Sequence, residues 1–142
     1  MNRFASVLVL LPVCLVLSGV ARGQEAPKGV TEIDQVTSVR LAWRAKPTAP
    51  TVVTSEKQLL TVMPNRSDAH RVVQSVNFKK QKLLIFAWEG DAQDRLNVER
   101  RGKTIRFVHW GNAAESDPHL HCRVFVIDSD VRYAIVAEPD PR

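Results

Sequence analysis

Four side chains with reactive or metal-binding chemistry gather in the second half of the chain. They are His109, His119, His121 and Cys122. Imidazole and thiolate groups are ligands that zinc and copper accept in proteins. Because side chains two positions apart on a β-strand point to the same face, His119 and His121 are expected to lie side by side. This spacing indicates a copper or zinc site on these two histidines, completed by a carboxylate from Glu115 or Asp117.

Strand alternation separates the cysteine from two of the histidines. The apolar side of the strand expected from residue 119 carries Leu120, Cys122, Val124 and Val126. Cys122 is therefore predicted to face the core, and so is His109, which shares a parity with Ile105 and Phe107. A buried pair of His109 and Cys122 has the residue types of a nucleophile and its base, although no third orienting group is recognisable. The alternative is a hydrogen-bonded core histidine beside an inert thiol.

The polar side of the same strand predicts a binding face. If the strands at 104–110 and 119–127 pair across the loop at 111–118, matching their apolar sides places cationic and aromatic side chains on one face. These are Arg106, Trp110, His119, His121 and Arg123. Such a face suits a protein or an anionic partner through charge-assisted hydrogen bonds and ring stacking. The alternative is an ordinary solvated strand face.

No catalytic motif accompanies these residues. The sequence holds no recognisable Ser, His and Asp arrangement or pair of catalytic carboxylates. The acidic stretch from Glu89 to Asp94 matches no standard calcium loop and reads as a solvated turn. We therefore expect a non-enzymatic binding module of unknown partner that needs no cofactor. The alternative is a periplasmic protein that binds copper or zinc through His119 and His121.

The first 23 residues have the pattern of an export signal. Arg3 supplies a positive start, residues 7–17 form an apolar core, and Ala21 and Gly23 offer a cleavage site. The core is shorter than the about 20 apolar residues that span a bilayer. The sequence thus predicts an exported protein, periplasmic or extracellular, with no transmembrane segment in the mature chain. Lipid attachment at Cys14 is the alternative, and the residues just before it fit that motif poorly.

Length and charge limit the rest of the chain to one domain. Without the signal, 119 of the 142 residues remain, with 18 Lys and Arg against 15 Asp and Glu. This mild balance does not indicate nucleic acid as a partner. Cys122 is then the one cysteine left, so no internal disulfide is expected. We expect a flexible leader at 24–35 and a single β-rich domain at 36–142.

Local patterns predict short strands and one helix within this domain. Extended segments are expected at 36–43, 51–54, 71–78, 83–88, 95–100, 104–110, 119–127 and 131–137. Ser55 and Gln58 form a capping-box pattern that begins a helix, and Pro64 with Asn65 is expected to end it.

The strand patterns also suggest how the sheet is built. Residues 83–88 are apolar on both parities, so this strand is expected at the centre, covered on both faces. Hairpins are expected between 95–100 and 104–110, and between 119–127 and 131–137. The predicted fold is mainly β: a small twisted antiparallel sheet, barrel-like or sandwich, with one short helix packed on one side.

Two segments carry a resemblance to known proteins. Residues 76–88 read V-N-F-K-K-Q-K-L-L-I-F-A-W, and residues 117–127 open an aliphatic and aromatic strand with Pro118 and His119. Over about residues 52–137 the chain resembles uncharacterised small exported bacterial β proteins with a V-[DN]-F-x-K-x-x-L-L core element. It is more weakly similar to the C-terminal β domain of a protease-complex subunit, with Asn77 in place of the usual Asp. These resemblances imply a shared β fold.

Overall fold

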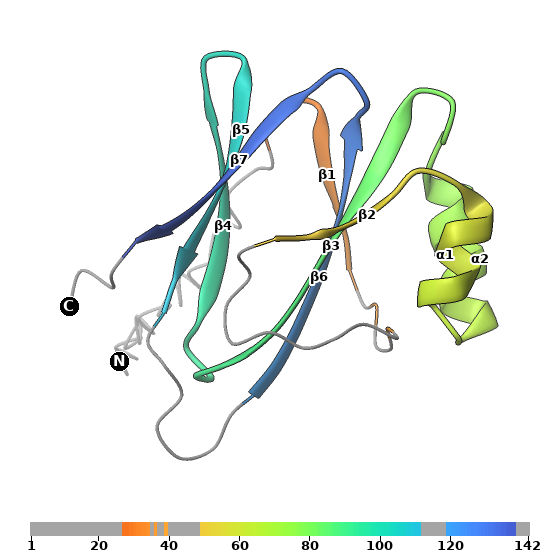
Figure 1. Ribbon diagram of the computed structural model, residues 1–142, viewed down its shortest axis with the longest axis horizontal. Coiled ribbons are helices and arrows are strands. Elements are labelled where there is room, and N and C mark those ends of the chain that lie inside the picture. Colours follow the sequence, from red (N-terminus) through yellow and green to blue (C-terminus); the bar gives the residue numbers. More distant parts are fainter. Residues whose placement is uncertain (1–26, 35, 37–38, 40–48, 112–118, 139–142) are drawn as a thin grey trace, which may run out of the picture.

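A computed structural model of the chain describes residues 27–34, 36, 39, 49–111 and 119–138 (Figure 1). Its elements are β1 (Val30–Ile33), β2 (Thr51–Val53), α1 (Glu56–Val62), α2 (Arg66–Ser75), β3 (Gln81–Gly90), β4 (Arg95–Arg101), β5 (Thr104–Trp110), β6 (His119–Asp128) and β7 (Arg132–Glu138). The fold is mainly β, as the sequence predicts. The predicted signal peptide at residues 1–23 lies outside the described residues.

The strands form two sheets. The first sheet is antiparallel with the order β1-β6-β3-β2, and the second is mixed with the order β4-β5-β7. In the second sheet β4 and β5 form the predicted hairpin, whereas β7 runs parallel to β5. The described strands close no barrel, so the sandwich alternative describes the fold.

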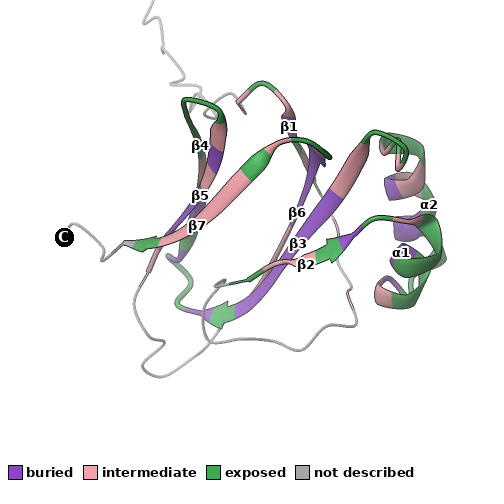
Figure 2. Ribbon diagram, turned by 45° about the horizontal axis from the view of Figure 1, so that its top comes forward, coloured by how far each residue is buried: buried purple, intermediate pink, exposed green. Residues whose placement is uncertain are grey.

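Two apolar clusters hold three layers together. Between the sheets, β3 and β6 contribute one parity of their side chains, including Phe86 and Phe125, which meet Phe107 of β5. The opposite parity of the same two strands, including Leu83 and Val124, packs against the helices. Figure 1 shows the helices on the side of the four-stranded sheet away from β4, β5 and β7. Residues 83–88 are buried throughout, which confirms the prediction of a central strand (Figure 2).

The first helix begins and ends where its caps predict. The Ser55 side chain accepts a hydrogen bond from the Gln58 backbone N–H, and Gln58 Oε1 accepts one from the Thr54 N–H at 2.8 Å. These bonds satisfy donors that the helix itself leaves without partners. Leu59 is fully buried beneath α1, while Leu60 is 53% exposed on the other side.

A second helix replaces the extended segment expected at 71–78, so that prediction is wrong. Asn65, expected to help end the first helix, instead caps α2 by accepting hydrogen bonds from the backbone N–H groups of Ser67 and Asp68. Ala69 and Val72, three positions apart, are buried on its inner face. The apolar side chains follow the helical period rather than the period of two.

The predicted flexible leader also differs from the structure, because residues 30–33 form β1. This strand pairs with β6, with Val30 opposite Ile127. Val30 is buried between the sheets, so three β-branched residues in a short stretch suffice for an edge strand. The strand expected at 36–43 falls largely outside the described residues, and Val36 and Val39 pack beside the helix-side cluster.

The hairpin expected between 119–127 and 131–137 is wrong in its pairing. Both strands exist, but a turn closed by the Val131 N–H and the Asp128 carbonyl sends β7 into the other sheet. Tyr133 and Ile135 then pack onto the inter-sheet cluster. Burial of these side chains between the sheets offsets the lost hairpin pairing.

The two adjacent leucines of α1 provide a test of this layering. Leu59→Ala is expected to lower the free energy of unfolding by about 2–5 kcal/mol, because it opens a cavity between helix and sheet. Leu60→Ala, its matched control, is expected to change that free energy by less than about 0.5 kcal/mol. Urea unfolding followed by circular dichroism measures both, and equal losses would contradict the helix orientation.

Candidate functional site

The five residues of the predicted binding face occupy two different sheets. Arg106 and Trp110 belong to β5, and His119, His121 and Arg123 belong to β6. Because β5 pairs with β4 and β7 while β6 pairs with β1 and β3, the pairing assumed across residues 111–118 is wrong. The prediction matches the apolar sides of two strands adjacent in sequence, but β5 and β6 belong to different sheets. The prediction of one shared face is therefore wrong.

The Arg123 side chain points between the two sheets rather than toward a partner. It shares a parity with Phe125 and Ile127, which point toward the second sheet. Its Nε and Nη2 atoms donate to the two carboxylate oxygens of Glu32, and Nη1 donates to the Leu96 carbonyl. One guanidinium thus connects β6, β1 and β4, and its donors are engaged within the chain.

Arg106 also has a carboxylate partner within the chain. It lies opposite Glu99 in the β4–β5 pairing and donates from Nη1 to Glu99 Oε1. Its parity, shared with Trp110, places both on the outer face of the second sheet, opposite to Ile105 and Phe107. The basic character expected for this face is reduced by the ion pair.

His121 and His119 lie at the end of the sandwich where β6 begins. The His121 ring stacks on Trp88, with ring centroids 4.7 Å apart and an interplanar angle of 9°. Its Nε2 donates to the Asp91 carbonyl at 2.9 Å, since a carbonyl oxygen only accepts. His119 is exposed opposite Gly90. No group of three or more metal-binding side chains is present among the described residues. The expected carboxylates, Glu115 and Asp117, lie outside them.

A buried polar cluster lies behind this ring stack, centred on Asp94. The Asp94 Oδ2 atom accepts from Trp88 Nε1 at 3.3 Å and lies 3.4 Å from His109 Nε2. Both side chains of the Asp94–His109 pair are less than 5% exposed. Trp88 contacts both histidines, because its ring also meets His109 edge to face. The cluster joins the ends of β3 and β5 to the start of β4.

Two glycines make room for the Asp94 carboxyl group. A Cβ atom at residue 90 would lie 1.9 Å from Asp94 Oδ2, and one at residue 111 would lie 2.1 Å from Oδ1. Asp94 Oδ1 is buried and has no hydrogen-bond partner among the described residues. The carboxyl group is thus enclosed between two bare backbone segments.

The cluster contains the residue types of an acid–base site, but its side chains are buried away from any substrate. An Asp–His pair orients an imidazole as in many catalytic sites, yet a general base must reach its substrate. Here both partners are buried, so the geometry supports cross-linking of three strand ends. Sequence reasoning missed Trp88 and Asp94, since one read as part of an apolar run and the other as part of a solvated turn. Gly90 and Gly111, at the ends of β3 and β5, were the available signal.

Cys122 lies on the other face of the four-stranded sheet, as its parity predicts. It packs beside the helix-side cluster, whereas His109 points between the sheets. The two residues therefore do not form a nucleophile and base pair. Burial raises the pKa of the Cys122 thiol from its ordinary 9.0 to about 11.

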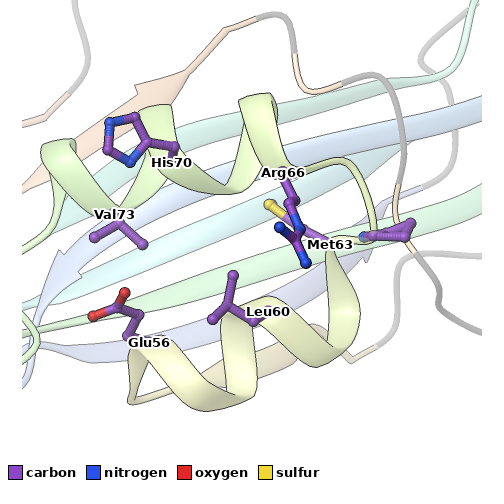
Figure 3. Close-up of a pocket in the computed structure, with 7 residues that line it drawn as sticks. Glu56, Leu60, Met63, Arg66, His70 and Val73 are labelled. Carbon is purple, nitrogen blue, oxygen red and sulfur yellow. The ribbon is translucent and has the colours of Figure 1, made fainter.

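A groove between the two helices is the second candidate site (Figure 3). Its volume is about 540 Å³, and it is lined by Glu56, Leu60, Met63, Pro64, Arg66, His70 and Val73. Figure 3 shows Leu60 and Val73 between the helices, with Glu56 toward one end and Arg66 toward the other. Neither charged group forms an ion pair with another described residue. Sequence reasoning missed this groove because it requires α2.

Membrane spans are not found in the described parts of the chain, where no helix is long and apolar enough to cross a bilayer.

The glycine cradle of Asp94 is testable by a double-mutant cycle. Gly90→Ala is expected to lower the free energy of unfolding by about 1–3 kcal/mol, because the new Cβ displaces the carboxyl group. In an Asp94→Ala background the same substitution meets no oxygen and should cost less than about 0.5 kcal/mol. Urea unfolding of the four proteins measures the coupling. Additive losses would show that Gly90 and Asp94 act independently.

The Cys122 thiol makes stability depend on alkaline pH. The unfolded thiol loses its proton near pH 9 and the folded thiol near pH 11, so the folded chain binds more protons between these values. The free energy of unfolding should therefore fall as pH rises through this window, and be fully retained below it. Urea unfolding at several pH values measures the slope, with Cys122→Ala as the control. An identical slope in the control would contradict thiol burial.

Comparison with known proteins finds no matching family model, curated protein or solved structure. The resemblance noted from residues 76–88 and 117–127 stays a prediction.

Proposed function

We propose that this protein is a non-enzymatic binding module that docks an amphipathic peptide segment of a protein partner in the groove between α1 and α2. The observation that carries the proposal is Leu60, which is 53% exposed and lines a groove of about 540 Å³. An exposed leucine beside a concave apolar surface is typical of a helix-in-groove binding site.

The groove has the parts that peptide recognition needs. Leu60, Met63 and Val73 supply an apolar lining that accepts one or two large apolar side chains. Glu56 and Arg66 carry opposite charges toward its two ends (Figure 3). A segment with an acidic group near Arg66 and a basic group near Glu56 therefore fits in one orientation.

We favour a protein partner over an anionic ligand, because the two arginines that could bind an anion already pair with glutamates. Arg106 is paired with Glu99, and Arg123 is paired with Glu32. Binding an anion at either guanidinium would compete with a carboxylate already in place. The α1–α2 groove has no such internal competitor among the described residues. A metal function through His119 and His121 gains no supporting ligand from the described residues.

We further propose that binding occurs outside the cytoplasm. This part of the proposal rests on the export-signal pattern of residues 1–23.

The groove is testable with a phage-displayed library of random peptides selected on the purified protein. Enriched peptides are expected to carry apolar residues at helical spacing, flanked by an acidic and a basic residue. Leu60→Ala should weaken their binding about tenfold or more, because the contact with a buried leucine is worth about 1.5–3 kcal/mol. Isothermal titration calorimetry measures each affinity.

Leu120→Ala is the matched control, because Leu120 is a 60% exposed leucine on β6, away from the groove. Its affinity for the selected peptides should equal that of the wild type. Peptides that lose affinity equally in both variants, or only in Leu120→Ala, would place the binding site elsewhere. A selection without enriched peptides would contradict peptide recognition.

A further inference from the structure

Basic side chains gather at one end of the sandwich, where four segments of the chain meet. These segments are the residue before β1, the turn between α2 and β3, the turn between β4 and β5, and the turn between β6 and β7. Figure 1 shows the three turns together at the top of the molecule. We call this surface the basic end and define it as residues 28, 79–82, 100–103 and 128–132.

Contacts between these segments show that they lie side by side. The β1 and β3 strands both begin opposite the end of β6, and β7 begins beside the start of β5. The Ser129 N–H donates to the Lys80 carbonyl at 2.8 Å, which joins the β6–β7 turn to the start of β3. Arg100 Nη1 donates to the Lys28 carbonyl at 2.9 Å, which joins the β4–β5 hairpin to the start of β1.

The basic end carries more positive charge than the whole chain. Its residues include eight Lys and Arg against two Asp, which gives a net charge of +6, whereas the full sequence has a net charge of +5. The opposite end of β3 leads instead to exposed Glu89 and Asp91. The mild overall balance therefore conceals one strongly positive surface, and an anionic partner is attracted to this end of the molecule.

The cations of the basic end are exposed and keep their charge. Those exposed at the turns between α2 and β3 and between β4 and β5 are Lys79, Lys80, Arg101 and Lys103. None of the ion pairs in the described parts of the chain includes a residue of the basic end. Lys82 and Arg100 donate to backbone carbonyls, which orient the two side chains without neutralising them. The basic end thus differs from Arg106 and Arg123, which pair with glutamates.

We propose that the basic end binds the surface of a lipid bilayer that contains anionic phospholipids. Lys and Arg side chains are attracted to such a surface by charge, and the contributions of several cations add when they reach it together. The three turns end at a similar level in Figure 1, so their tips can meet a flat surface at the same time. This contact is peripheral and does not involve the groove between α1 and α2.

The surroundings of the cations favour a membrane over a nucleic acid. Proteins that bind single strands use aromatic rings on which the bases stack. The ring that lies under Lys82 is that of Tyr133, which is only partly exposed and packs on the inter-sheet cluster. Duplex DNA is read by one helix or one β-ribbon that enters a groove. Here the cations come from four separate segments, an arrangement that suits a plane better than a groove.

Co-sedimentation of the purified full chain with vesicles tests the proposal. One set of vesicles is phosphatidylcholine alone, and the other contains about a third of phosphatidylglycerol. We expect binding to the anionic vesicles to be about a hundredfold tighter or more, with this preference falling as salt is added. The apolar residues 7–17 are present in every sample, so the ratio of the two partition coefficients isolates the effect of charge. Equal binding to both vesicles would overturn the proposal.

Two pairs of substitutions locate the contact. Lys79→Gln with Lys80→Gln removes two charges from one turn, and Arg101→Gln with Lys103→Gln removes two from another. Each pair should lower the preference for anionic vesicles about tenfold or more. Circular dichroism of each variant checks that the fold is retained.

The matched control is Lys57→Gln with Arg95→Gln, which removes two exposed charges outside the basic end. This variant should keep the preference of the wild type. A loss as large as that of the other pairs would overturn the proposal, because binding would then follow total charge.

Duplex DNA of random sequence, at the same phosphate concentration, distinguishes lipid from nucleic acid. Weaker binding to the duplex than to the anionic vesicles is expected, and tighter binding to it would overturn the proposal in favour of a nucleic acid. Leu60→Ala should bind the vesicles as the wild type does, so the groove test and the vesicle test can fail separately.

Discussion

The antiparallel pairing of β3 with β6 is the interaction on which the rest of the structure depends. Their register is continuous over ten residue pairs, from Gln81 opposite Asp128 to Gly90 opposite His119. Both strands have apolar side chains on each parity, so the pair offers two hydrophobic faces. One face takes the helices and the other takes the second sheet. Without this ladder neither cluster would form, because α1 and α2 pack on one of its faces and the β4–β5–β7 sheet packs on the other.

Polar groups connect the layers where the apolar clusters end. Arg123 joins β6 to β1 and β4, and Asp94 joins β4 to Trp88 of β3 and His109 of β5. Each buried polar atom that finds a partner fixes a relative position that apolar contacts alone leave adjustable. The histidines and arginines that first suggest chemistry are therefore largely committed to structure. Leu60 on α1 is an exposed apolar side chain that borders a groove, and this contrast is why the helices are the better candidate for recognition.

Much of the fold could be predicted from local patterns, because those patterns depend on residues close in sequence. The cap at Ser55, the central strand at 83–88 and the β4–β5 hairpin are of this kind. The sheet assignment of β7 could not be predicted, since parallel pairing with β5 leaves no local signature. The prediction of one shared binding face was wrong for a related reason. Strand parity placed Cys122 correctly, but whether the other side met water depended on which sheet lay opposite.

The position of β1 constrains the order in which the chain can fold. Val30 pairs with Ile127, about a hundred residues further along, and no described strand nearer in sequence pairs with β1. A chain made from its N-terminus must therefore keep β1 without a partner until β6 has been synthesised. The strand β3 can pair with β2 as soon as both are made, but its longest ladder is also with β6. Such distant contacts slow folding, because loop closure precedes any gain from pairing. The two faces of the β3–β6 ladder therefore form late, after the helices and the β4–β5 hairpin have been made.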